Sequence, residues 1–197
     1  MKVTYQEFID IIDAVGKATN EHKALIKRVF KEATGKEYEL PVKWYRKNKN
    51  ADIKNALALA GFKRGFSVRA EKTMGALSEY QTKCDESSHN RFDLSWEVEK
   101  DTRDFILAVE IEMSVEMSHI TKDFRKLVEN QSDCLKVIIC QAKRKCDESE
   151  LLKEMQKIIS EQKSKPTKPK GTFVLTIWSW ESKDNKGNKG KFIHKII

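Results

Sequence analysis

The apolar residues near the start of the chain recur with the spacing of helices. Thr4 and, three residues later, Glu7 form a capping-box pattern that opens a helix. The apolar positions that follow lie at i, i+3, i+4 and i+7, namely Phe8, Ile11, Ile12 and Val15. A second apolar stripe covers residues 20–34 and ends at Gly35, which predicts a second helix. The first 35 residues are therefore expected to form a helical hairpin, and a short helix is expected over residues 51–60.

From Gly65 onward the apolar period shortens to that of strands. Residues 66–70 alternate weakly, and residues 91–99 alternate strictly between apolar and polar, which predicts a half-buried strand. Residues 105–113 form a more continuous apolar run, as expected of a buried strand. The turn-forming residues between these two segments predict a β-hairpin.

The remaining pattern alternates helices with strands. Helices are expected over residues 118–130 and 148–162, and strands over 135–140, 173–180 and 191–197. The order from Gly65 is then βββαβαββ. We predict an α/β fold with a mixed central β-sheet flanked by helices, in which a helical N-terminal region of residues 1–64 precedes a core of residues 65–197.

Charge is distributed unevenly along the chain. The 197 residues include 38 Lys and Arg against 30 Asp and Glu, a net charge of +8. Residues 85–119 contain ten acidic and three basic side chains, a balance of −7, so the rest of the chain carries +15. A positive excess favours a polyanionic partner such as nucleic acid, because Lys and Arg neutralise phosphates. The alternative for the acidic segment is a solvated hairpin.

Membrane insertion and secretion are not expected. No apolar run approaches the roughly 18 residues of a spanning helix, and the first residues lack the apolar stretch of a signal peptide. The four cysteines form no CxxC pair and are expected to be reduced. These features favour a cytoplasmic protein.

The predicted hairpin brings acidic residues together. If its turn is centred between residues 101 and 102, opposed residues have numbers that add up to 203, and Asp93 faces Glu110. Opposed residues on antiparallel strands hold their Cβ atoms about 4.5 to 5.5 Å apart, and Glu112 joins the same face. A slip of one residue would move Asp93 to the other face. With this register, three carboxylates are expected to converge.

Such a cluster needs a compensating positive charge if it is buried. Two like charges about 5 Å apart repel by about 3 kcal/mol at an effective dielectric near 20. Glu110 and Glu112 interrupt an apolar strand, so their surroundings are expected to hold little water. Mg²⁺, or Mn²⁺ in its place, prefers carboxylate oxygens and is the natural compensating ion. The alternative is that both glutamates lie on an exposed face.

The acidic pattern and the elements around it resemble a known family. Asp93, then Glu110-Ile111-Glu112 on the next strand, then a helix and a short buried strand, are similar to the core of the PD-(D/E)XK nucleases. The resemblance implies a restriction endonuclease-like core in which Asp93 and Glu110 bind the metal. Glu112 stands where the family usually has Lys, as in its E-x-E form, and would orient or deprotonate the attacking water.

The resemblance also implies an upstream acid on a helix. Glu79 is the candidate, with Glu71 and Glu86 as alternatives. Because the family's usual Lys is missing, a substitute from elsewhere is conceivable. Lys122 and Lys126 follow the acidic strand, but they fall opposite the apolar stripe of their helix and are interpreted as solvated.

Two basic segments are candidates for nucleic-acid contacts. Trp44 and Arg46 lie in a basic, aromatic stretch that could stack on bases, or could form a loop docked on the core. A second segment, rich in lysine and proline, could hold a DNA backbone or be simply solvated, and its candidate contacts are Lys165, Lys168 and Lys170.

Taken with the resemblance, these features lead us to expect a Mg²⁺-dependent endonuclease that hydrolyses DNA, similar to a type II restriction enzyme. DNA is favoured over RNA, and a homodimer would allow both strands to be cut. One alternative is a nucleic-acid-binding protein on the same fold without catalysis. Another is a protein-interaction module whose acidic face meets a basic partner.

Overall fold

The computed structural model describes residues 3–37, 42–70, 92–99, 102, 104–142, 145–180 and 190–197, and the side chains of residues 42–48, 145–147 and 180 are outside this description. Its helices are α1 (Tyr5–Thr34), α2 (Val42–Lys63), α3 (Met117–Glu129) and α4 (Lys145–Lys163). Its strands are β1 (Ser67–Ala70), β2 (Leu94–Glu97), β3 (Phe105–Glu112), β4 (Leu135–Gln141), β5 (Thr172–Trp180) and β6 (Gly190–Ile196). In this part of the chain, no helix combines the length and apolar character needed to cross a bilayer.

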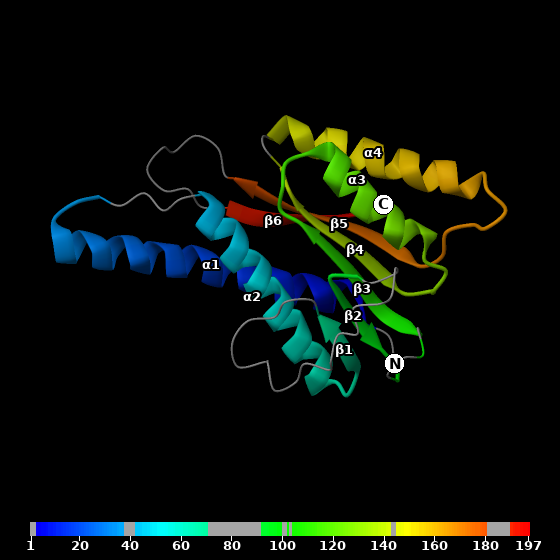
Figure 1. The fold of residues 1–197 in the computed structure, drawn as a ribbon, viewed down its shortest axis with the longest axis horizontal. Helices are drawn as coiled ribbons and strands as arrows, with labels where there is room; N and C mark the ends of the chain where they lie inside the picture. Colours follow the sequence, from blue (N-terminus) through cyan, green and yellow to red (C-terminus); the bar gives the residue numbers. More distant parts are fainter. Residues whose placement is uncertain are drawn as a thin grey trace.

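The described strands form one six-stranded mixed sheet in the order β1-β2-β3-β4-β5-β6. Strands β1, β2 and β3 are antiparallel neighbours, β3, β4 and β5 run parallel, and β6 returns antiparallel to β5. The predicted βββαβαββ order and α/β class are confirmed (Figure 1).

Helices cover both faces of the sheet. On one face, α1 and α2 pack their apolar residues, such as Phe8 and Leu57, against Trp96 and Trp178. On the other face, α3 and α4 lie side by side over β3, β4 and β5 and bury Phe124 and Met155 (Figure 1). The helices of residues 1–64 therefore share a hydrophobic core with the strands that follow them.

The predicted N-terminal hairpin is wrong, because α1 is one continuous helix of 30 residues. Its start is as predicted, with the capping box of Thr4 and Glu7 formed, and it ends at Gly35 in the left-handed conformation. Gly16 does not interrupt the helix: a Cβ there would lie 3.1 Å from the Phe192 ring and 3.3 Å from that of Trp178, so the missing side chain allows close packing on the sheet. The last turns of α1 extend beyond the sheet (Figure 1).

Two other elements differ from the prediction. Helix α2 begins at Val42, so Trp44 and Arg46 belong to a helix and not to a loop, and their side chains are outside the described residues. Strand β2 is buried on both faces instead of one. Its polar face tolerates burial because Glu97 forms an ion pair of 2.9 Å with Arg69 on the neighbouring strand.

Candidate functional site

The predicted hairpin register is confirmed from Leu94 to Trp96, and it shifts by one residue at Glu97, which pairs with Phe105. Leu94 pairs with Val109, and Ser95 pairs with Ala108, so the residue numbers add up to 203 as expected. Asp93 directly precedes β2 and therefore comes level with Glu110 of β3. Alternate residues of β3 contribute to the core under α1 and α2, so Glu110 faces the opposite side, under α3.

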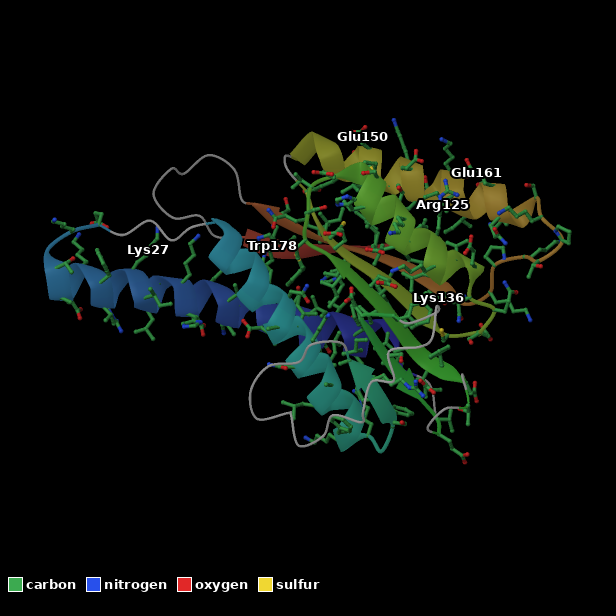
Figure 2. All side chains as sticks on the ribbon, viewed as in Figure 1. Lys27, Arg125, Lys136, Glu150, Glu161 and Trp178 are labelled. Atoms are coloured by element: carbon green, nitrogen blue, oxygen red, sulfur yellow. The ribbon has the colours of Figure 1, made fainter. Side chains whose placement is uncertain are left out.

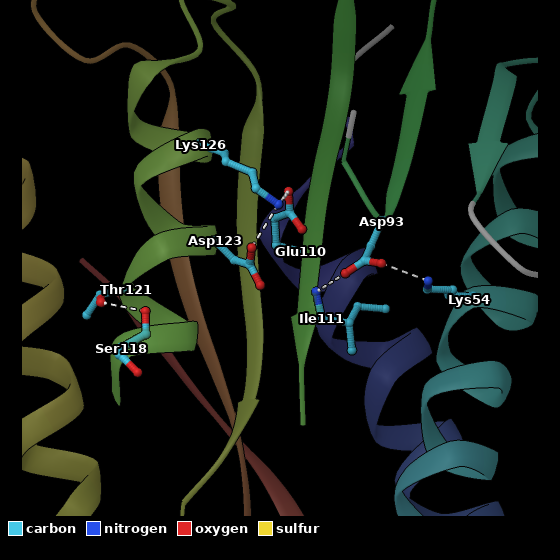
Figure 3. A network of polar contacts seen from close by, with 8 residues as sticks. All are labelled: Lys54, Asp93, Glu110, Ile111, Ser118, Thr121, Asp123 and Lys126. Atoms are coloured by element: carbon cyan, nitrogen blue, oxygen red, sulfur yellow. Dashed lines mark hydrogen bonds and ion pairs between the residues drawn. The ribbon is translucent and has the colours of Figure 1, made fainter. Parts of the chain in front are cut away.

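Asp93 is held by two contacts just before the start of β2. Its Oδ2 accepts a hydrogen bond of 2.8 Å from the backbone N–H of Ile111, and its Oδ1 accepts one of 2.8 Å from Lys54 Nζ (Figure 3). Lys54 comes from α2, and its side chain is buried while that of Asp93 is partly exposed. The carboxylate of Asp93 therefore joins β2, β3 and α2.

Glu110 is a buried carboxylate with an incomplete set of partners. The residue is only 2% exposed, and the ammonium of Lys126 lies 3.3 Å from its Oε1. The direction of that approach gives no well-formed hydrogen bond, and Oε1 has no hydrogen-bond partner among the described residues. Burial, and next the charge of Asp93, raise the pKa of Glu110 to about 8, against the opposing effect of Lys126.

Lys126 is shared between two acids of the site. Its Nζ lies 2.8 Å from Asp123 Oδ1, one turn earlier on α3, in addition to its ion pair with Glu110 (Figure 3). Burial lowers the pKa of Lys126, but the hydrogen bond with Asp123 and the charges of both acids outweigh it and raise that pKa. The ammonium of Lys126 is therefore held in its charged form.

Glu112 points to the following turn. It is half-buried, and its Oε1 accepts a hydrogen bond of 2.7 Å from the backbone N–H of Ser114. The expected convergence of three carboxylates is not found: the described residues hold no group of three acidic, histidine or cysteine side chains arranged to bind a metal ion. The structure brings together the pair Asp93 and Glu110. Glu79, Glu71 and Glu86 lie outside the described residues.

The pair has the chemistry of a site for a hard divalent cation. Mg²⁺ is commonly bound by one or two carboxylates, with water and substrate phosphate as the other ligands. Oε1 of Glu110 is a buried oxygen without a hydrogen-bond donor, and the raised pKa of this carboxyl shows that its charged form lacks sufficient compensation. A cation between Asp93 and Glu110 would supply it.

The two lysines of the site were not predicted. Lys126 and Lys122 are both exposed, as expected, but the ion pair of Lys126 with Glu110 was not predicted. The ion pair of Lys126 could have been predicted from Glu110, because an acid on a strand that faces the next helix favours a basic residue on that helix. The position of Lys54 was harder to predict, because a single lysine beside Ile53 and Leu57 in an apolar helix commonly extends to solvent.

The predicted DNA-backbone lysines lie in the exposed connection between α4 and β5, where Lys165, Lys168 and Lys170 are all exposed. This connection leads into the start of β5, which is level with Leu107 of β3 through Leu135 of β4, whereas Glu110 lies three residues further along β3. Figure 2 shows the same direction, with Lys136 near the start of β4 and Trp178 near the end of β5. The basic connection and the acidic pair are therefore displaced from each other along the strands.

No family model, curated protein or solved structure matches this chain. Inference about its function therefore depends on the chemistry of the acidic pair, the two lysines and the basic surface.

Proposed function

We propose that this chain is a Mg²⁺- or Mn²⁺-dependent endonuclease that hydrolyses phosphodiester bonds in DNA. The observation that carries the proposal is the pair Asp93 and Glu110, in which Glu110 is 2% exposed and its Oε1 forms no well-shaped hydrogen bond among the described residues, with Lys126 3.3 Å away as its ion-pair partner. The pair lies on a hairpin followed by α3 and the parallel strand β4, which is the order of elements that the resemblance to PD-(D/E)XK nucleases implies.

The residues of the site have distinct roles in this proposal. Asp93 and Glu110 would hold the cation, which polarises a phosphate and lowers the pKa of a bound water. The N–H of Ile111 holds the carboxylate of Asp93 beside β3. Glu112 would orient or deprotonate the attacking water, with one oxygen fixed by the N–H of Ser114. Lys126 favours the ionised form of Glu110.

The basic surface favours DNA as the substrate. The net charge of +8 comes from residues outside the acidic segment, and the exposed lysines of the α4–β5 connection could neutralise phosphates. Cleavage of both strands of a duplex needs two active sites, which a homodimer would supply.

One observation favours an alternative function. Lys54 and Lys126 already place an ammonium beside Asp93 and Glu110, so the pair has partial compensation without a metal ion. A nucleic-acid-binding protein without catalytic activity would need no positive charge at this pair beyond the two lysines.

The first prediction separates the two functions. Wild type should cut supercoiled plasmid or linear DNA with Mg²⁺ or Mn²⁺ and not with chelator, and RNA is included to test the substrate class. Asp93→Ala and Glu110→Ala should each lower cleavage by at least about 100-fold, because metal ligands act on the chemical step. DNA affinity in chelator should stay nearly unchanged.

Glu116→Ala is the matched control, because Glu116 is an exposed acid that follows the same strand. It should cut at the wild-type rate. If wild type binds DNA with strong salt dependence but cuts under none of these conditions, the non-catalytic function is correct. Cleavage by Asp93→Ala at the wild-type rate would contradict the site.

A further inference from the structure

Lys54 is a buried lysine whose ammonium is directed at the acidic pair. It lies on α2 beside Ile53, in the turn before Leu57, both of which are buried in the core under α1 and α2. Its side chain is 7% exposed, and its Nζ lies 2.8 Å from Asp93 Oδ1. Burial of an ammonium is unfavourable unless an opposite charge accompanies it. Asp93 provides that charge, so the two residues stabilise each other in the absence of metal.

The two oxygens of Asp93 are held by donors of different kinds. Oδ2 accepts from the N–H of Ile111, a backbone group fixed in β3. Oδ1 accepts from the end of a four-carbon side chain, which can change its rotamer without moving the sheet. A divalent cation bound by Asp93 would therefore share this carboxylate with the ammonium of Lys54 (Figure 3).

Lys126 is a weaker competitor at the other acid. Its side chain is 43% exposed, and it also forms an ion pair with Asp123. Water screens an exposed ammonium, and Asp123 would still hold Lys126 if it moved away from Glu110. The ammonium of Lys54 is buried beside its carboxylate, so its charge acts on Asp93 with little screening.

We propose that Lys54 is an internal cation that competes with the divalent metal ion for Asp93 and thereby sets the metal affinity of the site. The inference rests on the proposed function, because it assumes that Asp93 and Glu110 bind a cation. In the metal-free protein Lys54 neutralises Asp93. A metal ion on the same carboxylate would be repelled by this ammonium, because two cations a few ångströms apart repel each other. Lys54 thus keeps the metal-free site stable at the cost of weaker metal binding.

The second prediction tests this competition with Mn²⁺ alone, without substrate. Lys54→Met removes the ammonium and keeps most of the side-chain volume, so the full-length variant should bind Mn²⁺ at least about tenfold more tightly than wild type in isothermal titration calorimetry. In chelator the melting temperature of this variant should fall, because Asp93 has lost its positively charged partner and keeps only the N–H of Ile111. Adding Mn²⁺ should raise the melting temperature of Lys54→Met more than that of wild type.

Lys136→Met is the matched control. Lys136 is a fully buried lysine whose Nζ donates to the carbonyl oxygens of Asn130 and Lys170, away from the acidic pair. Its loss should leave Mn²⁺ affinity at the wild-type value. Lys54→Arg keeps the positive charge and should bind Mn²⁺ no more tightly than wild type. If Lys54→Met does not fold in chelator, Lys54→Gln keeps a donor for Asp93 and should also bind Mn²⁺ more tightly.

The possible outcomes distinguish the two proposals. Tighter binding by Lys54→Met or Lys54→Gln, with Lys136→Met unchanged, supports the competition. Equal or weaker binding by both Lys54 variants, while wild type binds Mn²⁺ through Asp93, overturns the competition and leaves the proposed function intact. Absence of Mn²⁺ binding in wild type and in every variant overturns both proposals.

Discussion

Glu110 is the residue whose charge fits its surroundings least well. It lies between Val109 and Ile111 on a buried strand, and burial together with the charge of Asp93 raises its pKa to about 8. In the metal-free protein at neutral pH, this carboxyl therefore binds a proton for much of the time. A metal ion at the site would have to displace that proton, so metal affinity should increase with pH.

The third prediction is a pH-dependent stability difference between wild type and Glu110→Gln in chelator. The pKa of Glu110 is raised from an ordinary value of 4.5 in the unfolded chain to about 8 in the folded protein. Between these values the unfolded state loses the proton first, so the contribution of Glu110 to stability falls as pH rises and is lowest above pH 8. Glutamine has no such proton. Glu110→Gln should therefore gain in melting temperature relative to wild type, by several degrees on going from about pH 5 to about pH 9.

An exposed acid of α1, Glu21, provides the comparison, since Glu21→Gln should show a difference from wild type that changes little between about pH 5 and about pH 9. A melting-temperature difference between Glu110→Gln and wild type that is constant across the pH range would mean that Glu110 is ionised throughout. Its burial would then be fully compensated by Lys126.

The residues of the site were predictable only where a backbone rule connects them. Asp93 and Glu110 follow from the hairpin register, because opposed positions on antiparallel strands are fixed once the turn is placed. No such rule predicts where the side chains of Lys54 and Lys126 lie. Each comes from a helix that packs beside the strand, and the direction of a long flexible side chain depends on helix rotation and tertiary distance. The hydrogen bond from the N–H of Ser114 to Glu112 is local, but it depends on the turn after β3, which was not predicted.

At the scale of elements, the sequence was informative where local pattern and tertiary environment agree. The hairpin, α3, β4, α4 and β5 have strong periodicity and were placed within a few residues. Helix α1 was split in the prediction at a stretch that contains three poor helix formers, Gly16, Thr19 and Asn20. Contacts far along the chain override that weakness: the Asn20 side chain bonds the backbone of Gly190, donating to its carbonyl and accepting from its N–H. Tertiary contacts of this kind cannot be derived from local propensity.

The starts of the parallel strands β4 and β5 are joined by a close backbone contact. The N–H of Thr172 donates to the carbonyl oxygen of Cys134, and a Cβ on Gly171 would lie only 2.3 Å from that oxygen. Lys136 adds a second link by donating to Asn130 and Lys170, on the two connections that enter these strands. The position before β5 therefore requires glycine for both conformation and space.

The fourth prediction compares Gly171→Ala with Gly35→Ala. Both glycines have positive φ, 86° and 68°, but Gly35 has no atom near its missing Cβ. Gly35→Ala should lower the free energy of unfolding by about 1 kcal/mol, the cost of the left-handed conformation alone. Gly171→Ala should lower it by at least about 3 kcal/mol, because the methyl group also forces the two strand connections apart. Urea unfolding curves measure both, and equal losses would show that the close contact is relaxed at no cost.

At the scale of the whole molecule, opposite charges are separated along the strands. Asp93 precedes β2 and is held by Lys54 of α2, and Glu110 lies on β3 beneath α3, inside a chain whose remaining residues are strongly basic. The exposed lysines before β5 lie toward the starts of the parallel strands, and Glu112 lies at the end of β3. Strand residues rise by about 3.3 Å each, so the level of these lysines and that of Glu112 are separated by about 17 Å along the sheet, about half of one helical turn of B-DNA. One bound duplex could therefore reach both regions.

The fifth prediction is that the basic connection contributes to DNA affinity but not to metal binding. Replacing its three exposed lysines by glutamine should weaken DNA binding in chelator and reduce the slope of log affinity against log salt by up to about 0.9 for each lysine that contacts a phosphate (Lys165, Lys168 and Lys170). The rise in melting temperature with Mn²⁺ should stay at the wild-type value, because the acidic pair lies further along the strands. The control is an equal loss of charge elsewhere, made by replacing three other exposed lysines with glutamine: Lys17 in α1, Lys36 just after α1, and Lys153 in α4. If the control triple variant lowers the salt slope as much as the first, DNA attraction is a property of the net charge, and the α4–β5 connection is not a binding surface.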